Sequence, residues 1–234
     1  MRLSTLSIGG ITPLSSTDYP GHLAAVVFCQ GCSWRCGYCH NPHLIPRQAV
    51  ATFSWAGIRE FLERRRGLLD AVVFSGGEPT LHRGLLDAVK ETRELGYKIA
   101  LHTGGPVPSR LHKLLPFLDW VGMDIKADFE NYEGITGAPC SGIKALESAQ
   151  ILIKSGADCE FRTTVHPALH TEADILALAK TLQAMGVRHY VLQVFRATGC
   201  GDARLDAVST PGYPGAGLLA QVAALFDSFS LRQA

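Results

Sequence analysis

Three cysteines near the start of the chain have the residue type and the spacing most able to do chemistry. Cys32, Cys36 and Cys39 follow the pattern C-x3-C-x2-C. Thiolates hold iron–sulfur clusters, and a four-iron cube offers one ligand position on each iron. Three closely spaced thiolates therefore hold three irons and leave the fourth open to a small molecule. The motif predicts a cluster that takes part in chemistry as well as in electron transfer.

Two other kinds of metal site have to be weighed against this prediction. A structural zinc site usually splits its ligands into two pairs separated by roughly 12–20 residues, and no second cysteine pair follows here. Cys29 raises the local number of cysteines to four, so a closed site with four thiolate ligands is an alternative. Cys29 ends the apolar run 23–29, however, and free cysteine behaves as a small buried hydrophobe. We interpret Cys29 as a strand residue, and the scattered Cys140, Cys159 and Cys200 as free thiols.

The cysteine motif resembles the signature of the radical S-adenosylmethionine enzymes. Within them the chain is similar to the activating enzymes of glycyl radical enzymes, most of all to the long-form activating proteins of anaerobic ribonucleoside-triphosphate reductases. The segments behind this resemblance are Gly-Gly-Ile at 9–11, Asp-Tyr-Pro-Gly at 18–21, Val-Val-Phe at 26–28, Gln-Gly-Cys at 30–32 and Tyr-Cys-His-Asn-Pro at 38–42.

The resemblance implies two cofactors: a [4Fe–4S] cluster on Cys32, Cys36 and Cys39, and S-adenosylmethionine chelated by the open iron. A low-potential donor such as flavodoxin or ferredoxin would supply one electron, and cleavage of the sulfonium would give a 5′-deoxyadenosyl radical. In activating enzymes this radical takes a hydrogen atom from a backbone glycine of a partner, here expected to be an anaerobic ribonucleoside-triphosphate reductase. Residues 18–21 resemble the segment near the partner's glycine loop. Because the cofactors carry the chemistry, we expect no catalytic acid or base.

Apolar, β-branched runs alternate with helical patterns along the chain. The predicted strands are 23–29, 71–75, 98–102, 120–125, 159–165 and 190–195. The predicted helices are 55–66, 83–95, 109–117, 143–154, 172–185 and about 213–230. Gly67, Gly96, Gly156 and Gly186 follow four of the helices, where C-terminal glycine caps belong. Strands that alternate with helices predict a parallel sheet, but six units are too few for an eight-fold barrel.

The resemblance implies how the sheet curves. We expect an α/β fold with an open, partial (β/α)6 barrel. We expect one domain over 1–234, with a core at about 20–200. Composition agrees with an enzyme of this kind, because 47% of the 234 residues are hydrophobic and the net charge of +1 favours no nucleic-acid surface. Seven cysteines, an odd number, argue against a disulfide framework. The N-terminus lacks the apolar stretch of a signal peptide, and no apolar run reaches the ~18 residues of a membrane helix, so we expect a cytoplasmic protein.

Active sites of such folds lie at the C-terminal ends of the strands, and the remaining motifs all fall there. These candidate cofactor-binding residues are Tyr38, His40, Gly76, Gly77, Glu78, Thr103, Asp124, Lys126, Arg162 and Arg196. The resemblance implies that the Gly-Gly-Glu turn cradles the methionyl amino group, that Asp124 holds ribose hydroxyls or an ammonium, and that Lys126 pairs with the methionyl carboxylate.

Each of these motifs also has a simpler interpretation. Two glycines can make an ordinary strand–helix turn. Asp124 and Lys126 can form a surface salt bridge, which is common and individually worth little. Tyr38 and His40 flank the third cysteine and are expected against the adenine, but His40 can equally be a hydrogen-bonding loop residue.

One position departs from the family pattern. Many activating enzymes have Asp-Thr-Asn-Gly after the third strand, and some hold a monovalent cation there. This chain has His102 followed by Thr-Gly-Gly, so the acidic residue is missing. The substitution puts a cation at this position in doubt.

Three other functions remain as alternatives. An activator of pyruvate formate-lyase or of another glycyl radical enzyme differs only in its partner. A radical enzyme that acts on a small molecule, such as a deazapurine synthase or a peptide modifier, is disfavoured by the N-terminal segment and by the absence of a C-terminal cysteine-rich extension. A plain iron–sulfur electron-transfer module is disfavoured by the ligand motifs, because a relay needs no ligand pocket.

The cluster prediction is tested by iron and sulfide content. Anaerobically reconstituted protein should hold about four irons and four sulfides per chain. Single alanine substitutions of Cys32, Cys36 or Cys39 should abolish the cluster, whereas Cys29→Ala should retain it. Loss of the cluster in Cys29→Ala would refute the three-ligand prediction and favour the closed four-thiolate site.

Overall fold

The computed structural model describes residues 6–48, 52–206, 208 and 211–233. Within these residues the strands form one eight-stranded sheet in which spatial order follows chain order. The strands are β1 (Ile8–Ser15), β2 (Ala24–Cys29), β3 (Ala71–Gly76), β4 (Lys98–Thr103), β5 (Trp120–Asp124), β6 (Cys159–Val165), β7 (His189–Val194) and β8 (Ser228–Arg232). β1 pairs with β2 in antiparallel fashion, and every later neighbour is parallel.

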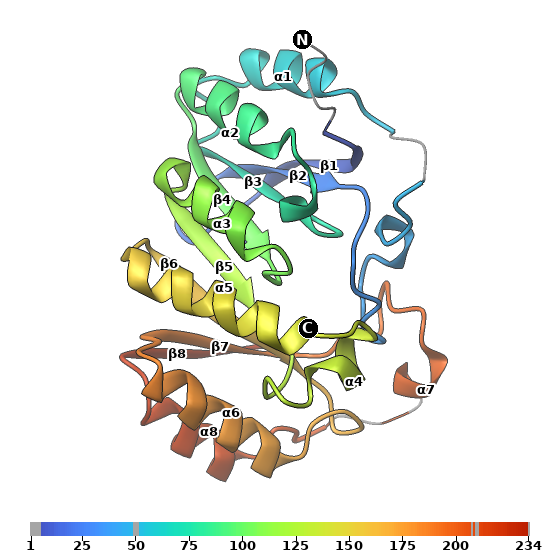
Figure 1. Ribbon diagram of the computed structural model, residues 1–234, viewed down its shortest axis with the longest axis vertical. Helices are drawn as coiled ribbons and strands as arrows, with labels where there is room; N and C mark the ends of the chain where they lie inside the picture. The colour runs from blue at the N-terminus through green and yellow to red at the C-terminus, as the bar shows by residue number, and fades with distance from the viewer. Residues whose placement is uncertain (1–5, 49–51, 207, 209–210, 234) are drawn as a thin grey trace.

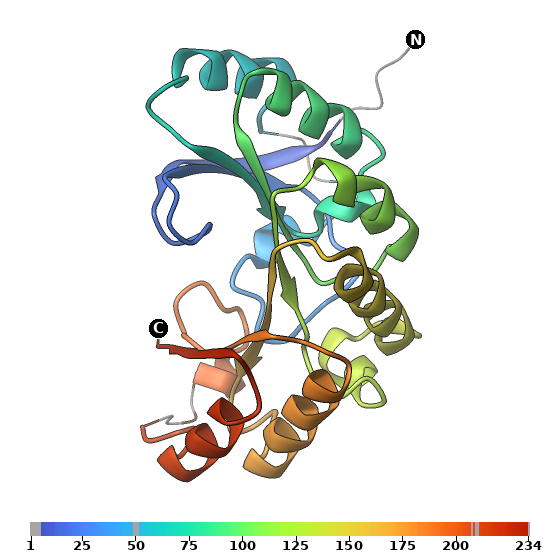
Figure 2. The ribbon, with the colours of Figure 1, turned by 90° about the vertical axis from the view of Figure 1, so that its left-hand side faces the viewer.

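Helices wrap around the convex face of the curved sheet, while the concave face stays open on the other side (Figures 1 and 2). The α-helices are α1 (Trp55–Arg64), α2 (Leu85–Glu94), α3 (Pro108–Leu114), α4 (Tyr132–Thr136), α5 (Ser141–Ser155), α6 (Glu172–Ala184), α7 (Ala203–Asp206) and α8 (Ala216–Ala223). Short 3-10 turns are η1 (Pro42–Leu44), η2 (Pro79–Leu81) and η3 (Leu115–Phe117). The architecture confirms the predicted α/β fold with an open partial barrel. No helix in the described residues is long and apolar enough to cross a membrane.

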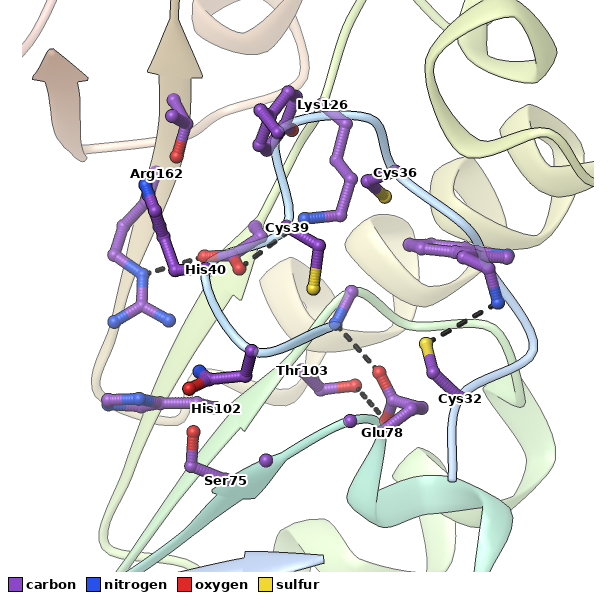
Figure 3. Close-up of a pocket in the computed structure, with 18 of the residues that line it drawn as sticks. Cys32, Cys36, Cys39, His40, Ser75, Glu78, His102, Thr103, Lys126 and Arg162 are labelled. Carbon is purple, nitrogen blue, oxygen red and sulfur yellow. Dashed lines mark hydrogen bonds and ion pairs between the residues drawn. The ribbon is translucent and has the colours of Figure 1, made fainter. Parts of the chain in front are cut away.

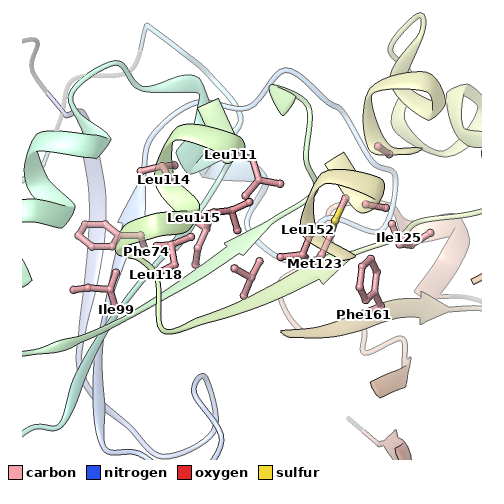
Figure 4. Close-up of a cluster of buried hydrophobic side chains, with 14 of the residues drawn as sticks. Phe74, Ile99, Leu111, Leu114, Leu115, Leu118, Met123, Ile125, Leu152 and Phe161 are labelled. Carbon is pink, nitrogen blue, oxygen red and sulfur yellow. The ribbon is translucent and has the colours of Figure 1, made fainter. Parts of the chain in front are cut away.

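The main core lies between the sheet and its helices. For this reason the sequences of the parallel strands are continuous runs of apolar residues. A strand buried on both faces keeps few polar positions, and four residues of β3, Ala71 to Phe74, are fully buried. Figure 4 shows part of this core, where Phe74, Ile99 and Met123 of three strands meet Leu111 and Leu152 of α3 and α5.

The helix boundaries follow the local signals in the sequence. Gly96, Gly156 and Gly186 have positive φ, between 69° and 95°, at or directly after the ends of their helices, which confirms three of the predicted glycine caps. Gly67 also has a positive φ, of 77°, but it lies two residues beyond Arg65, which caps α1. α6 begins with a capping box, because the side chains of Thr171 and Asp174 each accept a hydrogen bond from the other's backbone N–H.

Two terminal strands were not predicted. β1 contains two glycines and a proline, which weaken a strand pattern. Gly9 packs closely there, because a Cβ would overlap the side-chain ends of Gln30 and Leu44. The final helix is shorter than predicted: α8 ends at Ala223, and residues 228–232 form β8 beside β7. The short α4 and α7 were also missed, because a one-turn helix has too little periodicity to be recognised.

The concave face of the sheet has an apolar half and a charged half. The apolar half, under β2 to β5, is formed by Tyr19, Ala24, Val26, Ala71, Val73, Ala100 and Trp120. Side chains alternate between the faces of a strand, so Glu160, Arg162 and Thr164 of β6 share the concave face. Glu160 accepts two hydrogen bonds of 2.8 Å from Arg232 of β8. The charged half therefore lies under β5 to β8.

A pair of helical glycines tests how tightly the helices pack. At Gly142 in α5 a Cβ would overlap the backbone carbonyl of Phe129, whereas at Gly217 in α8 no atom lies within 4 Å. Gly142→Ala should lower the free energy of unfolding by about 1–3 kcal/mol or more, because the backbone must shift. Gly217→Ala should raise it by up to about 1 kcal/mol, because alanine favours the helix. Urea unfolding followed by circular dichroism measures both, and equal shifts would contradict the close packing at Gly142.

Candidate functional site

A cavity of about 260 Å³ lies at the C-terminal ends of the strands (Figure 3). Twelve of the thirteen predicted site residues line it: Cys32, Cys36, Tyr38, Cys39, His40, Gly76, Gly77, Glu78, Thr103, Asp124, Lys126 and Arg162. The thirteenth, Arg196, lines an adjoining cavity of about 770 Å³ that opens on the concave side of the sheet. The fold thus brings together segments that are up to about 130 residues apart in sequence, from Cys32 to Arg162.

The loop that carries the three cysteines is held in place by its backbone. The N–H of Gly31 donates to the carbonyl of Leu44 at 2.7 Å, and the N–H of Cys32 donates to Ile45 at 3.0 Å. Farther along, the N–H of Arg35 donates to the carbonyl of Thr136 at 2.7 Å. These backbone hydrogen bonds hold the loop in shape, and the Sγ of Cys32 accepts one more, from the N–H of Trp34 at 3.4 Å.

The thiols lie in surroundings that disfavour a free thiolate. Burial, with Glu78 nearby, raises the pKa of Cys32 to about 12, and burial also raises the pKa of Cys36. A metal ligand must be deprotonated, so iron would have to displace these protons. Among the described residues no three histidine, cysteine or acidic side chains converge closely enough to hold a single metal ion. A cube presents a different iron to each thiolate, so its ligands stand farther apart than the ligands of one ion.

Two buried hydroxyl groups beside the cysteines have no hydrogen-bond partner within the part of the chain that the structure describes. These are Ser33 Oγ and Tyr38 Oη, and Tyr38 lines the cavity while Ser33 adjoins Cys32. A buried polar group without a partner is unfavourable by about 1–3 kcal/mol. Unpaired hydroxyls around three thiols fit an additional polar group at this position, and the donor set of three cysteines fits an iron–sulfur cluster.

The Gly-Gly-Glu turn packs directly against the cysteine loop. The N–H of Gly77 donates to Cys29 and the N–H of Glu78 donates to Gly31, both at 2.9 Å. A Cβ on Gly77 would lie 2.5 Å from the carbonyl oxygen of Gly31, and Gly76 has a φ of 117°. Both glycines are therefore required by backbone packing alone, and a larger residue at Gly77 would also displace the cysteine loop.

The carboxylate of Glu78 binds protein groups rather than facing the cavity. The side chain accepts hydrogen bonds from the N–H and hydroxyl of Thr80, at 2.9 and 2.6 Å, from the hydroxyl of Thr103 at 2.7 Å and from the N–H of Gly104 at 3.0 Å. Burial raises the pKa of Glu78, and these donors oppose the shift. Glu78 thus joins the turns after β3 and β4, and any contact of this turn with a ligand would come from its backbone.

Asp124, Arg162 and Lys126 form an ion-paired group on the cavity wall. Arg162 Nε lies 2.9 Å from Asp124 Oδ1, and Lys126 Nζ lies 3.6 Å from Asp124 Oδ2. Burial alone would raise the pKa of Asp124, but the two cations outweigh it and hold the pKa at about 2. The side chains of Arg162 and Lys126 are only 8% and 13% exposed, so this is not the surface salt bridge of the simpler interpretation. Asp124 itself is 36% exposed, which leaves its carboxylate accessible.

Lys126 keeps its charge in this setting. Burial would lower its pKa, but the oxygens of Tyr38 and Asp124 raise the pKa of Lys126 above the ordinary value. Its ammonium also lies 5.5 Å from the centre of the Tyr38 ring. Lys126 can therefore present a cation to an anionic group in the cavity.

His102, in β4, occupies the position where the family resemblance led us to expect an acidic residue. Its Nε2 lies 2.7 Å from the backbone carbonyl of Asp18, which makes Nε2 the protonated nitrogen. Burial and the charge of Arg162 lower the pKa of His102 to about 3, so the imidazole is neutral near pH 7. The position offers no carboxylate to a cation, and the group instead fixes the turn that contains Asp18.

His40 takes part in a contact that also involves Arg196. Its Nε2 lies 3.1 Å from the backbone carbonyl of Arg196, and its ring stacks on Phe195 at 5.8 Å. The geometry agrees with the interpretation of His40 as a hydrogen-bonding loop residue. It ties the cysteine loop to the segment after β7, while the Arg196 side chain lines the adjoining cavity.

Several lining residues were not singled out by sequence reasoning. Thr164 and Gln193 line both cavities, and they face each other in the pairing of β6 with β7. Strand alternation from Arg162 would have placed Thr164 on the same face. Tyr132 was also missed: its hydroxyl accepts from the N–H of Lys126 at 3.1 Å and donates to the carbonyl of Asp124 at 3.2 Å. No sequence signal marks that contact, because α4 is a single short turn.

Comparison with known protein families identifies the cysteine-containing fold. The model of the Radical SAM superfamily, where SAM denotes S-adenosylmethionine, matches residues 26–182. A protein of Methanocaldococcus jannaschii named as a candidate glycyl-radical enzyme activating enzyme is 28% identical over 224 residues, which cover 87% of this chain and 86% of the relative. The pyruvate formate-lyase-activating enzyme of Clostridium pasteurianum is 34% identical over 164 residues, covering 62% of this chain and 65% of that enzyme.

Solved structures share the fold at low sequence identity. SuiB of Streptococcus suis, bound to S-adenosylmethionine, superposes with a TM-score of 0.64 at 14% identity, covering 88% of this chain. This chain spans 48% of the SuiB chain. QueE of Escherichia coli superposes with a TM-score of 0.57 at 17% identity and covers 99% of this chain and 94% of its own.

The free energy of unfolding tests whether Glu78 holds the turns after β3 and β4 together. Glu78→Gln replaces one accepting oxygen by an N–H₂ group that faces donors, so it should lower the free energy of unfolding by about 1–3 kcal/mol. Glu147→Gln, an exposed change of the same chemistry on α5, should leave it within about 0.5 kcal/mol. Urea unfolding gives both values. Equal stability of the two variants would show that the hydrogen bonds of Glu78 contribute little.

Proposed function

Because this chain belongs to the radical SAM superfamily, whose members use a [4Fe–4S] cluster and S-adenosylmethionine, we propose that it installs a glycyl radical on a partner enzyme. The observation that carries the proposal is the shared cavity of Cys32, Cys36, Cys39, the Gly76-Gly77 turn and the Asp124–Lys126 pair. A site for electron transfer alone would need the thiols but not the cationic and anionic side chains beside them.

We propose separate roles for the residues around this cavity. Cys32, Cys36 and Cys39 bind the cluster, and the Lys126 ammonium pairs with the methionyl carboxylate of S-adenosylmethionine. Asp124, held ionised by its two cations, accepts from the ligand's ammonium or hydroxyl groups. The bound cofactors supply a 5′-deoxyadenosyl radical, which requires one electron from a low-potential donor such as flavodoxin or ferredoxin. The remaining residues position the ligand and exclude water from it.

The adjoining cavity provides a place for a protein substrate. It is about 770 Å³ in volume, it opens on the concave side, and Asp18, His102 and Arg196 line it. A glycine in a large enzyme must be delivered on an extended segment, because hydrogen transfer needs the reacting atoms within roughly 3–4 Å. Asp18 lies at the junction of the two cavities and can accept hydrogen bonds from such a segment.

We propose an anaerobic ribonucleoside-triphosphate reductase as the partner, on the sequence resemblance. Similarity to the Clostridium pasteurianum enzyme supports pyruvate formate-lyase or another glycyl radical enzyme as the alternative partner. Similarity to the 7-carboxy-7-deazaguanine synthase of Thermococcus kodakarensis, 24% identical over 151 residues, keeps a small-molecule substrate as the second candidate function.

The proposal is tested by electron paramagnetic resonance. Reduced protein with S-adenosylmethionine should cleave the cofactor slowly alone and should produce a doublet glycyl signal on an anaerobic ribonucleotide reductase. Asp18→Ala should lose at least about tenfold in radical yield while retaining uncoupled cleavage, because its contact is with the partner rather than with the cofactor. Asp87→Ala, the same change on the remote α2 helix, serves as the control and should match the wild type.

A different result would refute the activator proposal. If the wild type gives no radical on any glycyl radical enzyme of its genome but converts a small molecule, the small-molecule candidate is correct.

A further inference from the structure

A third cavity reaches the cysteine loop from the side opposite the proposed S-adenosylmethionine site. Its volume is about 470 Å³, and it is lined by Cys32, Ser33, Arg35, Ile45, Pro46, Arg47 and Gln48. Cys32 and Ile45 line both this outer cavity and the inner one. A cluster bound to Cys32 is therefore separated from solvent on this side only by residues of its own loop and of the segment after η1. This loop forms one edge of the molecule, to the right in Figure 1.

The outer cavity is positively charged. Arg35 and Arg47 are both exposed, and neither forms an ion pair or a side-chain hydrogen bond within the described residues. No acidic residue lines the cavity. The backbone N–H of Arg35 is bonded to the carbonyl of Thr136 at 2.7 Å, so its side chain projects from a fixed point of the loop. These two exposed guanidinium groups place uncompensated positive charge beside Cys32, which favours an anionic partner.

The positive charge continues onto the neighbouring surface. Arg83, Arg110 and Lys113 line an adjacent cavity of about 310 Å³ with His82 and three leucines, and that cavity also has no acidic lining. His82 lies within reach of charges from both cavities, because burial, together with the charges of Arg110 and Arg47, lowers its pKa. We call Arg35, Arg47, Arg83, Arg110 and Lys113 the basic face.

The two sides of the cysteine loop suit two different partners. The inner side holds the ligand pocket and leads to the cavity of about 770 Å³, so a bound cofactor and a protein substrate would close that route. An electron must nevertheless reach the cluster for every cleavage. The outer side, where Cys32 lines the cavity of about 470 Å³, is an approach that a ligand and a substrate on the inner side would leave open.

We propose that the basic face is the docking site of an acidic electron-donor protein, a flavodoxin or ferredoxin, that reduces the cluster through the side of the loop at Cys32. This inference rests on the proposed function, because it requires a cluster at the three cysteines. In the transfer step the donor is oxidised by one electron and the cluster is reduced by one electron, with no bond made or broken. Opposite charge across the contact raises the encounter rate and orients the donor.

The test compares a protein donor with a small chemical reductant. Fully reduced flavodoxin and dithionite are each mixed with reconstituted protein under anaerobic conditions, and cluster reduction is followed by stopped-flow absorbance per cluster. The double variant Arg35→Glu/Arg47→Glu should be reduced by flavodoxin at least about tenfold more slowly at low salt, since steering of this kind changes association rates by 10–1,000-fold. Its reduction by dithionite, a small anion that needs no docking surface, should change far less.

Two controls separate docking from damage to the site. Arg66→Glu changes the same charge at an exposed position beyond the end of α1, on the opposite rim of the sheet, and should react like the wild type. Added salt should slow flavodoxin reduction of the wild type far more than that of the double variant. Arg35→Lys/Arg47→Lys, which keeps the charge, should restore most of the rate.

The outcomes distinguish this inference from the proposed function. A wild-type flavodoxin rate in the double variant, or an equal loss with both reductants, would overturn the docking site. Failure of wild-type protein to cleave S-adenosylmethionine with dithionite would instead overturn the proposed function, and it would do so independently of the flavodoxin result.

Discussion

Glu78 is 2% exposed, and a buried carboxylate is strongly unfavourable unless donors surround it. Here Thr80, Thr103 and Gly104 supply those donors, so the turns after β3 and β4 must keep their relative position. The same turn holds the cysteine loop through Gly77 and Glu78, whose N–H groups donate to the strand end and to Gly31. The geometry of the thiols thus depends on one buried carboxylate in the wall of the cavity, whose oxygens are bound by protein donors.

The division of the concave face explains how a half-open barrel remains stable while it holds a polar site. Beneath β2 to β5 the apolar residues, with Trp120 stacked on Tyr19 at 5.5 Å, close the interior. Beneath β5 to β8 the cations and carboxylates neutralise each other, as in the pairs of Asp124 with Arg162 and Glu160 with Arg232. Charged side chains in this half leave room for solvent and ligand, whereas a fully apolar interior would fill the space with packed side chains.

Much of this arrangement could be predicted from residue patterns. The six inner strands, five of the helices and three of the glycine caps follow from periodicity and local preference, and strand ends place most of the site on one rim. The roles of Gly77, Glu78 and His40 could not be read in this way, because each depends on a tertiary neighbour: a carbonyl of Gly31, donors on another turn, and the backbone of Arg196. β8 was read as helix because its apolar residues continue those of α8, and only pairing with β7 identifies it as a strand.

The order of strands in the sheet is the order of strands in the chain, and this has a consequence for biosynthesis. Each new strand finds its neighbour already formed, so the sheet can grow outward from the N-terminus as the polypeptide leaves the ribosome. The cysteine loop and the turn at Gly77 that supports it emerge within the first third of the chain. A further anchor, the carbonyl of Thr136, follows well before the final strand, whereas the contact of His40 with Arg196 requires the segment after β7. The loop can therefore be largely held in place on a nascent chain that still lacks β7 and β8, and it gains its last contact only when Arg196 has been made.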